Sequence, residues 1–475
     1  MKLNLLAGHS KGESVNFVGH DCINMFPVIL PDVDVGKEKI ILKPTSGLQT
    51  ITTVGSNPIL AGCTINNQAY FISGTTVYTL IGNTATSIGT ISTPQYPRLC
   101  MIPGAENFIL ICNGSDGYVI DQEANTVLQV TDGDFPGAEC GDFEDGYWVV
   151  VRSGRVYFSE LNNPFAWVAA DVFTPTNKPD KAIALKILQE EIYVFGNQSS
   201  EVYYNDGSTP FQRRAFSTTG YGLLNKDCLT FIDNSIVFLS IGIDRIIRVI
   251  QISPGGVRAM SSDSLNYELS AIEGIQGAYC MAYCERGHNM FQITVPNVDK
   301  TWVLDLSTIM VHRRSSFLGY DATGVPINGR HIANCVWADN VRILMGDYRT
   351  GNLYELRSDV YTENSNYMLR TFTSPTFRFE DNYVSAGLVE IDVETGLVSS
   401  SASTTPTLKF SYSRDGGYVY SRPKWKTLGA AGKYNTLYRQ YTLGRSKNWN
   451  FKIEISDASN FTIGQAVVHG IIGTK

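Results

Sequence analysis

A Gly-x-Ser-x-Gly pattern near the start of the chain could supply a nucleophilic serine. Gly8 to Gly12 match the nucleophile elbow of α/β-hydrolases, with Ser10 at the position of the nucleophile. That elbow follows a strand of a parallel sheet and opens a helix, and the segment before Ser10 is too short to build such a sheet. The chain also shows no alternation of strands and helices. The pattern therefore predicts a flexible turn and not a catalytic serine.

A second pattern is typical of carbohydrate-processing propellers. Ser413 to Tyr420 resemble the Asp-box of sialidases, Ser-x-Asp-x-Gly-x-x-Trp, with Tyr420 in place of tryptophan. In that motif the serine and the aspartate hydrogen-bond a hairpin turn, and glycine supplies a positive φ. A single copy predicts a structural hairpin and not a glycosidase site.

Two further patterns contain metal-ligand side chains. Cys280, Cys284 and His288 are three potential ligands, whereas zinc sites usually have four, with closer cysteines. Asp132 to Asp134 begin like a calcium loop, but Pro136 replaces an oxygen ligand and the bidentate glutamate is missing. The sequence therefore predicts no catalytic residue, no metal site and no cofactor.

Basic residues cluster only locally. The pairs Arg213-Arg214 and Arg313-Arg314 are short, and a third group lies near the C-terminus. This third group combines cations with an aromatic ring, as nucleic-acid or partner contacts do. Its predicted contact residues are Arg422, Lys424, Trp425 and Lys426. The alternative is that they form a solvated strand face.

Composition limits the class of protein. The chain has 475 residues, 43% of them hydrophobic and 17% charged, and a net charge of −7. An acidic protein without a long basic stripe is not expected to grip nucleic acid, but it could form a wall past which DNA slides. Nine scattered cysteines suggest no disulfide framework and favour a reducing compartment. We expect neither a signal peptide nor insertion into a membrane.

Hydrophobic patterning predicts short strands almost throughout, with one helix at Ser264 to Ile272. A strand–turn–strand theme starts at Ala69 and recurs in steps of 38, 40, 44, 44, 55 and 52 residues. Propeller blades repeat at roughly 40–50 residues and must stack around an axis to bury both of their faces. We therefore predict an all-β chain with a β-propeller of six or seven blades over residues 49–370.

The remaining segments differ in style from the propeller. Longer alternating strands are predicted at Phe377 to Phe379, Gly387 to Val393 and Thr407 to Ser413, with an exposed loop at Thr395 to Thr407. They predict an additional C-terminal β-sandwich platform domain over residues 371–475. Residues 1–48 lack a domain of their own and are predicted to be an N-terminal arm that joins the platform.

The order of several motifs resembles the tail nozzle proteins of short-tailed bacteriophages, also called packaged-DNA-stabilisation proteins of the podovirus tail hub. The stretches that carry the resemblance are Cys22 to Pro27, Lys43 to Leu48, Phe158 to Leu161, Pro179-Asp180, Phe195 to Tyr204 with Pro210-Phe211, Trp302 to Asp305, and Gly346-Asp347 with Gly351 to Tyr354. Ser46 stands where the family's turn usually has proline.

The resemblance implies a place in the virion. Such proteins form a hexameric ring below the portal and its adaptor, the head-tail connector, in a tail assembled in the bacterial cytoplasm. The ring completes the DNA ejection channel, helps to retain the packaged genome, and is plugged by a tail needle or its equivalent. Tailspikes or fibres attach nearby, and DNA passes without sequence-specific binding. The family offers no catalytic residue to carry over.

Two other functions stay open from the residues alone. A propeller glycosidase of the sialidase type would need several Asp-boxes and an arginine cluster facing a carboxylate substrate. A bacterial sugar-binding or adaptor propeller would be favoured by a secretion signal.

Overall fold

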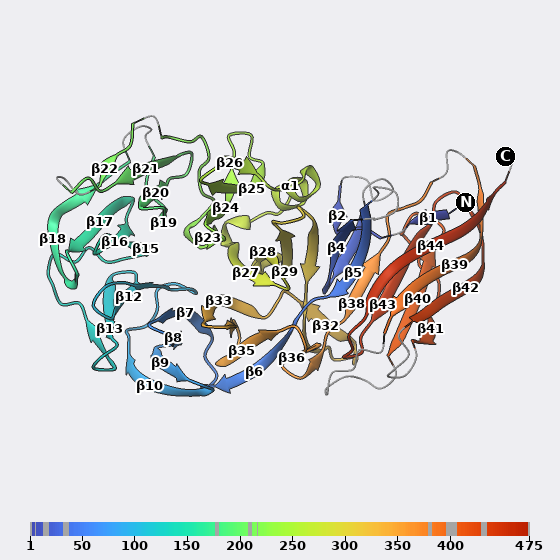
Figure 1. The fold of residues 1–475 in the computed structure, drawn as a ribbon, viewed down its shortest axis with the longest axis horizontal. Helices are drawn as coiled ribbons and strands as arrows, with labels where there is room; N and C mark the ends of the chain where they lie inside the picture. Colours follow the sequence, from blue (N-terminus) through green and yellow to red (C-terminus); the bar gives the residue numbers. More distant parts are fainter. Residues whose placement is uncertain are drawn as a thin grey trace.

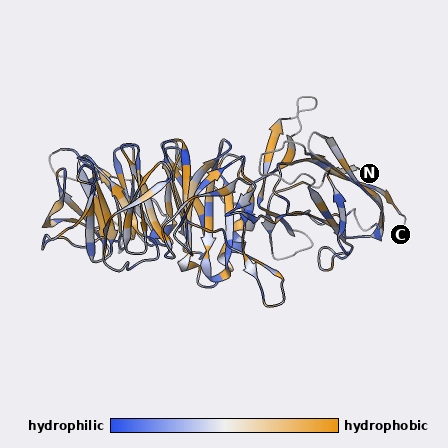
Figure 2. Ribbon diagram, turned by 90° about the horizontal axis from the view of Figure 1, so that it is seen from below, coloured by the Kyte–Doolittle hydropathy of each residue, from blue (hydrophilic) through white to orange (hydrophobic). Residues whose placement is uncertain are grey.

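The computed structural model describes residues 2–4, 6–12, 19–31, 38–175, 180–207, 211–215, 217–378, 382–395, 406–428 and 435–473. Figure 1 shows a ring of small sheets at one end and a second β-domain at the other, with both termini at the far end of that second domain. In Figure 2 the ring is seen edge-on, and the second domain lies beside it. The predicted fold class, an all-β propeller with an additional β-sandwich, is confirmed.

The propeller has seven four-stranded blades in the described residues: five are separate sheets, and the sixth and seventh are parts of larger sheets. The first blade contains β7 (Ile59–Ile65), β8 (Gln68–Ser73), β9 (Thr76–Ile81) and β10 (Thr84–Thr90), and the second contains β11 (Cys100–Pro103), β12 (Phe108–Asn113), β13 (Asp116–Asp121) and β14 (Thr126–Gln129). The third blade contains β15 (Cys140–Glu144), β16 (Tyr147–Arg152), β17 (Arg155–Glu160) and β18 (Asn163–Phe173). The fourth contains β19 (Ala184–Leu188), β20 (Glu191–Phe195), β21 (Ser200–Tyr204) and β22 (Gln212–Arg213). The next two are β23 (Leu229–Ile232), β24 (Ser235–Ile241), β25 (Ile247–Ser253) and β26 (Gly256–Ala259); and β27 (Tyr279–Glu285), β28 (His288–Val295), β29 (Lys300–Asp305) and β30 (Val311–Arg314).

The seventh blade joins two distant parts of the chain. Its strands β33 (Ala333–Asp339), β34 (Arg342–Asp347) and β35 (Asn352–Arg357) are completed by β6 (Gly47–Thr53) from the N-terminal region. Register pairs such as Leu356 with Leu48 hold the two ends of the ring together. Figure 1 shows β6 running beside β35 into the domain junction.

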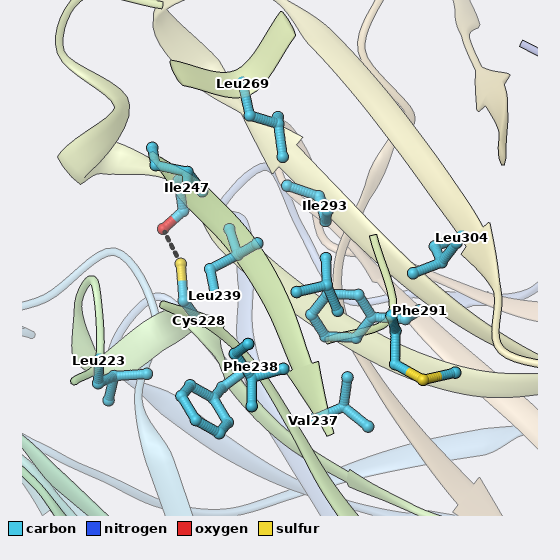
Figure 3. Close-up of a cluster of buried hydrophobic side chains, with 14 of the residues drawn as sticks. Leu223, Cys228, Val237, Phe238, Leu239, Ile247, Leu269, Phe291, Ile293 and Leu304 are labelled. Atoms are coloured by element: carbon cyan, nitrogen blue, oxygen red, sulfur yellow. Dashed lines mark hydrogen bonds between the residues drawn. The ribbon is translucent and has the colours of Figure 1, made fainter. Parts of the chain in front are cut away.

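Burial explains why the second strand of each blade was predictable from the sequence. β8, β12 and β24 are buried along nearly their whole length, because neighbouring blades cover both faces, whereas the outer strands β10, β14 and β26 are largely exposed. Figure 3 shows such a contact: Phe238 and Leu239 from β24 share one apolar cluster with Phe291 and Ile293 from β28. The helix α1 (Asp263–Ser270) adds Leu269 to this cluster.

The sandwich has two sheets in the described residues. One contains β1 (Lys2–Asn4), β4 (Met25–Pro31), β5 (Glu38–Pro44), β44 (Thr462–Ile472), β39 (Val384–Glu394) and β42 (Asn435–Ser446). The other contains β2 (Ser10–Lys11), β3 (Gly19–Ile23), β38 (Arg370–Thr373), β43 (Asn450–Ile455), β40 (Thr407–Ser413) and β41 (Lys424–Thr427). Phe410, Trp449 and Phe451 stack in the core between them. Strands from the N-terminal region thus belong to both sheets.

The second sandwich sheet is continuous with the sixth blade through one parallel bridge between Ile23 and Arg313. Short elements surround this connection: the hairpin β31 (Ser316–Tyr320) and β32 (Pro326–Gly329), and the strands β36 (Thr362–Glu363) and β37 (Asn366–Tyr367). Three 3-10 helices, η1 (Lys226–Cys228), η2 (Ile275–Gly277) and η3 (Pro296–Val298), lie in connections of the fifth and sixth blades. No helix among the residues described here has the length and apolarity to cross a bilayer.

Several predicted elements match the structure closely. Tyr147–Arg152 and Glu191–Phe195 are strands that begin at two of the predicted steps from Ala69, and the predicted helix overlaps α1. The predicted strand at Phe377 to Phe379 is wrong in the part that can be described, since Phe377 makes a single bridge to Trp449 and no strand; residue 379 lies outside the described residues. Most of the predicted loop at Thr395 to Thr407 also lies outside them.

Candidate functional site

The junction between propeller and sandwich is built around one asparagine. Asn24 lies between β3 and β4 with a φ of 55°, in the left-handed region that asparagine tolerates better than most residues. Its side-chain amide donates to the carbonyl oxygens of Ser315 and Leu369, both at 2.9 Å, and its side-chain oxygen accepts from the Ser315 amide at 3.0 Å. Its backbone amide donates to Arg313 O at 2.8 Å. One side chain therefore links the end of the sixth blade to the start of the sandwich.

A buried charge cluster lies beside Asn24, and we call it the Arg314 cluster. Arg314 on β30 is fully buried. Its guanidinium donates to Ser46 O at 2.8 Å and to the Tyr283 hydroxyl at 3.2 Å. It forms ion pairs with Glu363 at 3.5 Å and with Glu285 at 3.9 Å. The cluster joins β27 and β30 of the sixth blade to β36 and to the turn that precedes β6.

Electrostatics keeps this cluster charged. Burial acts to raise the pKa of the Glu363 carboxyl, but a hydrogen bond from His331 and the positive charge of Arg314 outweigh it, so the pKa is lowered. Burial and the nearby Arg314 lower the pKa of His331, which favours its neutral form. A buried arginine between two carboxylates is costly to disturb, because removing one partner leaves an uncompensated charge in a low-dielectric site.

A second polar group, here called the His9 latch, fastens the N-terminal segment. His9 Nδ1 lies 2.9 Å from Asp21 on β3, and His9 Nε2 lies 2.7 Å from Glu268 on α1. Arg313 Nη1 completes the group at 3.1 Å from Asp21. The His9 amide also donates to Val311 O at 2.6 Å. The latch therefore connects the arm to both the helix and the sixth blade.

The latch favours the ionised form of its members. Burial alone would lower the pKa of His9, but its hydrogen bonds to Asp21 and Glu268 outweigh that effect and raise it. Burial alone would raise the pKa values of Asp21 and Glu268, but the hydrogen bonds from His9 lower both. Each charge thus stabilises the others.

Two family-like stretches serve the junction directly. Thr45 and Ser46 lie in the Lys43 to Leu48 turn; Thr45 N donates to Asn24 O, and Ser46 contacts Arg314. At Gly47 a Cβ atom would lie 2.4 Å from Thr362 O, so no larger residue fits without a shift. The sequence motifs near the start of the chain are therefore parts of the interdomain contact.

The stretch from Phe195 to Tyr204 has a different structural role. Asp180 accepts hydrogen bonds from the backbone amides of Asn197 at 2.8 Å, Gln198 at 2.8 Å and Ser199 at 3.0 Å. A Cβ at Gly196 would lie 2.4 Å from an Asp180 carboxylate oxygen, so glycine permits the close approach. This carboxylate organises the turn between β20 and β21.

The predicted flexible turn at Gly8 to Gly12 is wrong in its conformation, because Ser10 and Lys11 form the short strand β2, which pairs with β3. The Ser10 hydroxyl donates to the Ser264 hydroxyl at 2.8 Å. Ser264 also accepts from Lys11 N at 2.8 Å. Ser10 is thus a contact between the arm and α1.

The Asp-box-like segment forms the predicted hairpin turn. Ser413 Oγ accepts from Gly417 N at 2.9 Å, and Asp415 accepts from the amides of Tyr418 and Val419 at 3.0 Å each. An isolated bridge pairs Ser413 with Tyr420. All these bonds stabilise the turn itself.

The potential metal ligands are used separately. His288 Nδ1 pairs with Asp305 at 2.8 Å, and Cys284 Sγ donates to Asn289 Oδ1 at 3.0 Å. Asp132 accepts from Asp134 N and, at 2.9 Å, from Trp167 N, which fixes a loop between blades. Across the described ranges, no three His, Cys, Asp or Glu side chains converge as a metal site.

The predicted contact residues near the C-terminus lie on and beside an edge strand. All four residues of β41 are exposed, and Arg422 precedes it. Lys424 and Lys426 stand opposite the buried Phe410 and Leu408. Trp425 faces the other side of the sheet, where Lys409 Nζ lies 4.5 Å from its ring centroid.

The sheet geometry therefore divides the four residues. Because alternate strand residues face opposite sides, the two lysines and the tryptophan do not form a single flat patch. Trp425 remains 63% exposed and the strand edge is unpaired within the described residues. Contact with a nucleic acid or a partner at these residues stays a prediction.

Sequence reasoning missed the buried role of Arg314, which stood in a basic pair with Arg313. In the structure both arginines face carboxylates: Arg313 pairs with Asp21, and Arg314 with Glu285 and Glu363. The sequence around the pair gave no signal of burial: Arg314 ends the strand β30, and its partners Glu285 and Glu363 lie elsewhere in the chain. Their convergence is a tertiary feature.

Two protein-family models match this chain. A model described as bacteriophage P22 Gp10, β-propeller, matches residues 1–361, and one described as bacteriophage P22 Gp10, β-sandwich, matches residues 370–470. No curated protein matches the chain.

Several solved structures show weaker likeness. The Cps50 (Swd1) β-propeller domain of Myceliophteria thermophila is 9% identical, with a TM-score of 0.43, covering 65% of this chain and all of that one. The extracellular domain of BT4673 from B. thetaiotaomicron is 12% identical, with a TM-score of 0.44, covering 94% of this chain and 61% of that one. At such scores these likenesses add nothing to the family match.

Proposed function

Since this chain belongs to the bacteriophage P22 Gp10 family of phage tail proteins, we propose that it forms the nozzle ring of the tail, below the portal and its adaptor. The observation that carries the proposal is the match of both family models, in order, along almost the whole chain. In this role the ring completes the DNA ejection channel and retains the packaged genome. The ring is hexameric, is assembled in the bacterial cytoplasm, and contacts the adaptor, a needle or plug, and a spike or fibre.

The junction supports a load-bearing role. Asn24, the Arg314 cluster and the His9 latch fasten the sandwich to the sixth blade through buried polar bonds. A ring that must hold pressurised DNA needs subunits whose two domains keep a fixed angle. Closed rings also require the same angular placement of every subunit. A subunit whose propeller and sandwich are fixed to each other would meet both requirements, the fixed interdomain angle and the repeated placement around the ring.

The proposed ring lets DNA pass without holding it. The chain carries a net charge of −7. Lys424 and Lys426 are the two cations of the exposed strand β41. Binding to duplex DNA depends on many simultaneous phosphate contacts. Retention is therefore mechanical, by a closed tube and a plug.

In the proposed role the protein is not an enzyme. Ser10 contacts Ser264, and Asp415 stabilises its own turn, so the residues that suggested chemistry have structural partners. A screen of esterase and glycosidase substrates with the wild type and Ser10→Ala tests this. Turnover that Ser10→Ala abolishes would contradict a purely structural role.

The proposed place in the tail is tested with particles that lack this protein. Such particles should package DNA and then lose it, which nuclease treatment followed by measurement of protected genome detects. Adding back the purified chain should restore protection, and adding back Arg314→Met should restore less. Full protection of the genome in particles without the chain would contradict the proposal. Native mass measurement of the chain with portal and adaptor gives the ring number.

A further inference from the structure

A cavity of about 370 Å³ occupies the centre of the propeller. The innermost strands of the blades line it, from β7 and β11 round to β33. Its wall combines cations with thiols: Arg98, Lys186, Lys226, Cys100, Cys140, Cys280 and Cys335. Small solutes that enter the propeller along its axis would meet these groups first.

One of these thiols has a cysteine directly across the sheet. Cys100 on β11 is the register partner of Cys112 on β12. Opposed residues of an antiparallel pair have Cα atoms about 4.5–5.5 Å apart, which lies within the roughly 4.4–6.8 Å that a disulfide spans. The Cys100 thiol lies on the cavity wall and donates to Gly141 O at 3.6 Å, whereas Cys112 is fully buried. A disulfide between them therefore requires little movement of the backbone.

The surroundings activate Cys100 in particular. The neighbouring Cys112 thiol is the largest influence and, with the Gly141 backbone and the charge of Lys186, lowers the pKa of Cys100 against burial and the charge of Asp142. Other groups that face it are the thiols of Cys63 and Cys140. A lowered pKa gives Cys100 a larger thiolate fraction at neutral pH than an ordinary cysteine has.

The other thiols of the cavity wall lack this combination. Burial raises the pKa values of Cys140 and Cys280, and it raises that of Cys335 to about 12. Cys280 does have a neighbouring thiol, Cys228, which donates to Ala278 O at 3.3 Å. Cys228 does not line the cavity, and the register partner of Cys280 is Ile293, so this pair is an internal comparison: two neighbouring thiols without the cross-strand geometry.

We propose that Cys100 is an oxidation site in the propeller channel, with Cys112 as its resolving cysteine and a hydroperoxide as the oxidant. The Cys100 thiolate attacks one peroxide oxygen, the O–O bond breaks, and the sulfur becomes a sulfenic acid while the other oxygen takes a proton from solvent and leaves as water or alcohol. The Cys112 sulfur then attacks the sulfenic sulfur, the S–O bond breaks, and its proton leaves with the hydroxyl as water. The inference does not depend on the tail assignment.

The test uses the full chain with Cys284→Ser, because Cys284 is an exposed thiol that would react without selectivity. The reduced, folded protein is treated with hydrogen peroxide, quenched with an alkylating agent in denaturant, and mapped by mass spectrometry without reduction. We expect a Cys100–Cys112 disulfide to form at least about tenfold faster than a Cys228–Cys280 disulfide, because only Cys100 and Cys112 are opposed across a strand pair. The rate should rise with pH as the Cys100 thiol ionises.

Two variants separate the steps. Cys112→Ser should stop at a sulfenic acid on Cys100 that dimedone traps, and Cys100→Ser should give neither product. If either variant fails to fold, the pH profile and peptide map of the parent protein still decide. Two results would overturn the proposal. One is that Cys100 and Cys112 stay reduced under peroxide treatment that oxidises an ordinary thiol; the other is that the Cys100–Cys112 and Cys228–Cys280 disulfides form at equal rates.

Discussion

Replacing Arg314 by methionine should break the Arg314 cluster without leaving a large void. Methionine fills much of the same space but carries no charge and no donors. The carboxylates of Glu285 and Glu363 would stay buried without their cation, and Ser46 O and the Tyr283 hydroxyl would each lose a hydrogen bond. Because the side chain is fully buried, water cannot replace these partners.

The expected loss can be estimated from the burial of the pair. Removing one partner of a buried ion pair typically costs about 3–5 kcal/mol, which is roughly a 100- to 3,000-fold change in the folding equilibrium. The matched control is Arg248→Met, which breaks the ion pair between Arg248 and Asp244. The side chain of Arg248 is 31% exposed and that of Asp244 is 46% exposed. Solvent-exposed ion pairs contribute about 0.2–1 kcal/mol. The two arginine variants should therefore differ clearly.

Equilibrium urea unfolding of the full chain, followed by tryptophan fluorescence and by proteolysis at the junction, measures the effect. A second variant, Arg314→Met with Glu363→Gln, removes the stranded charge and should recover part of the lost stability, since a neutral amide is cheaper to bury than a carboxylate. If Arg314→Met unfolds at the same urea concentration as Arg248→Met, or if the double variant is no more stable than the single one, the account of the cluster is wrong.

Four further outcomes are expected. The folded state raises the pKa of His9 and lowers those of its two carboxylate partners. The latch should therefore stabilise the protein most between about pH 4.5 and 6.5. The stabilisation by the latch should weaken as the pH rises through the raised pKa of His9 or falls through the lowered pKa values of the carboxyls. The measurement is the difference in unfolding free energy between wild type and His9→Gln, and a difference that does not change with pH would contradict this. Asp180→Asn should destabilise the fourth blade by about 1.5–3 kcal/mol, the range for hydrogen bonds to a charged acceptor, as hydrogen exchange at the β20–β21 turn would detect. Gel-shift titration at physiological salt should detect no specific DNA binding. Tight, strongly salt-dependent binding that is lost in the double variant Lys424→Gln, Lys426→Gln would refute the proposal that DNA passes without being held. Chelators should leave assembled rings intact, and rings that dissolve would point to a metal.

The sequence alone was sufficient for the blades and for the family. Strands such as β16 and β20 are short apolar runs between turn residues, so their identity depends on neighbours in the chain. Stacking of blades explains why those runs are continuously apolar. The order of motifs such as Cys22 to Pro27 identified the family that the two models match. Both signals are local or linear, and both can be read without knowing which residues meet.

The tertiary structure decided how the parts are joined. β6 closes the ring next to β35, although some 300 residues separate them, and hydrophobic patterning carries no information about that pairing. Asn24 looks like a turn residue, yet it bonds to Ser315 and Leu369. Arg314 looked like half of a surface basic pair, and it is buried because Glu285 and Glu363 arrive from distant strands. A charged side chain is buried only where partners converge on it, and convergence is a property of the folded chain.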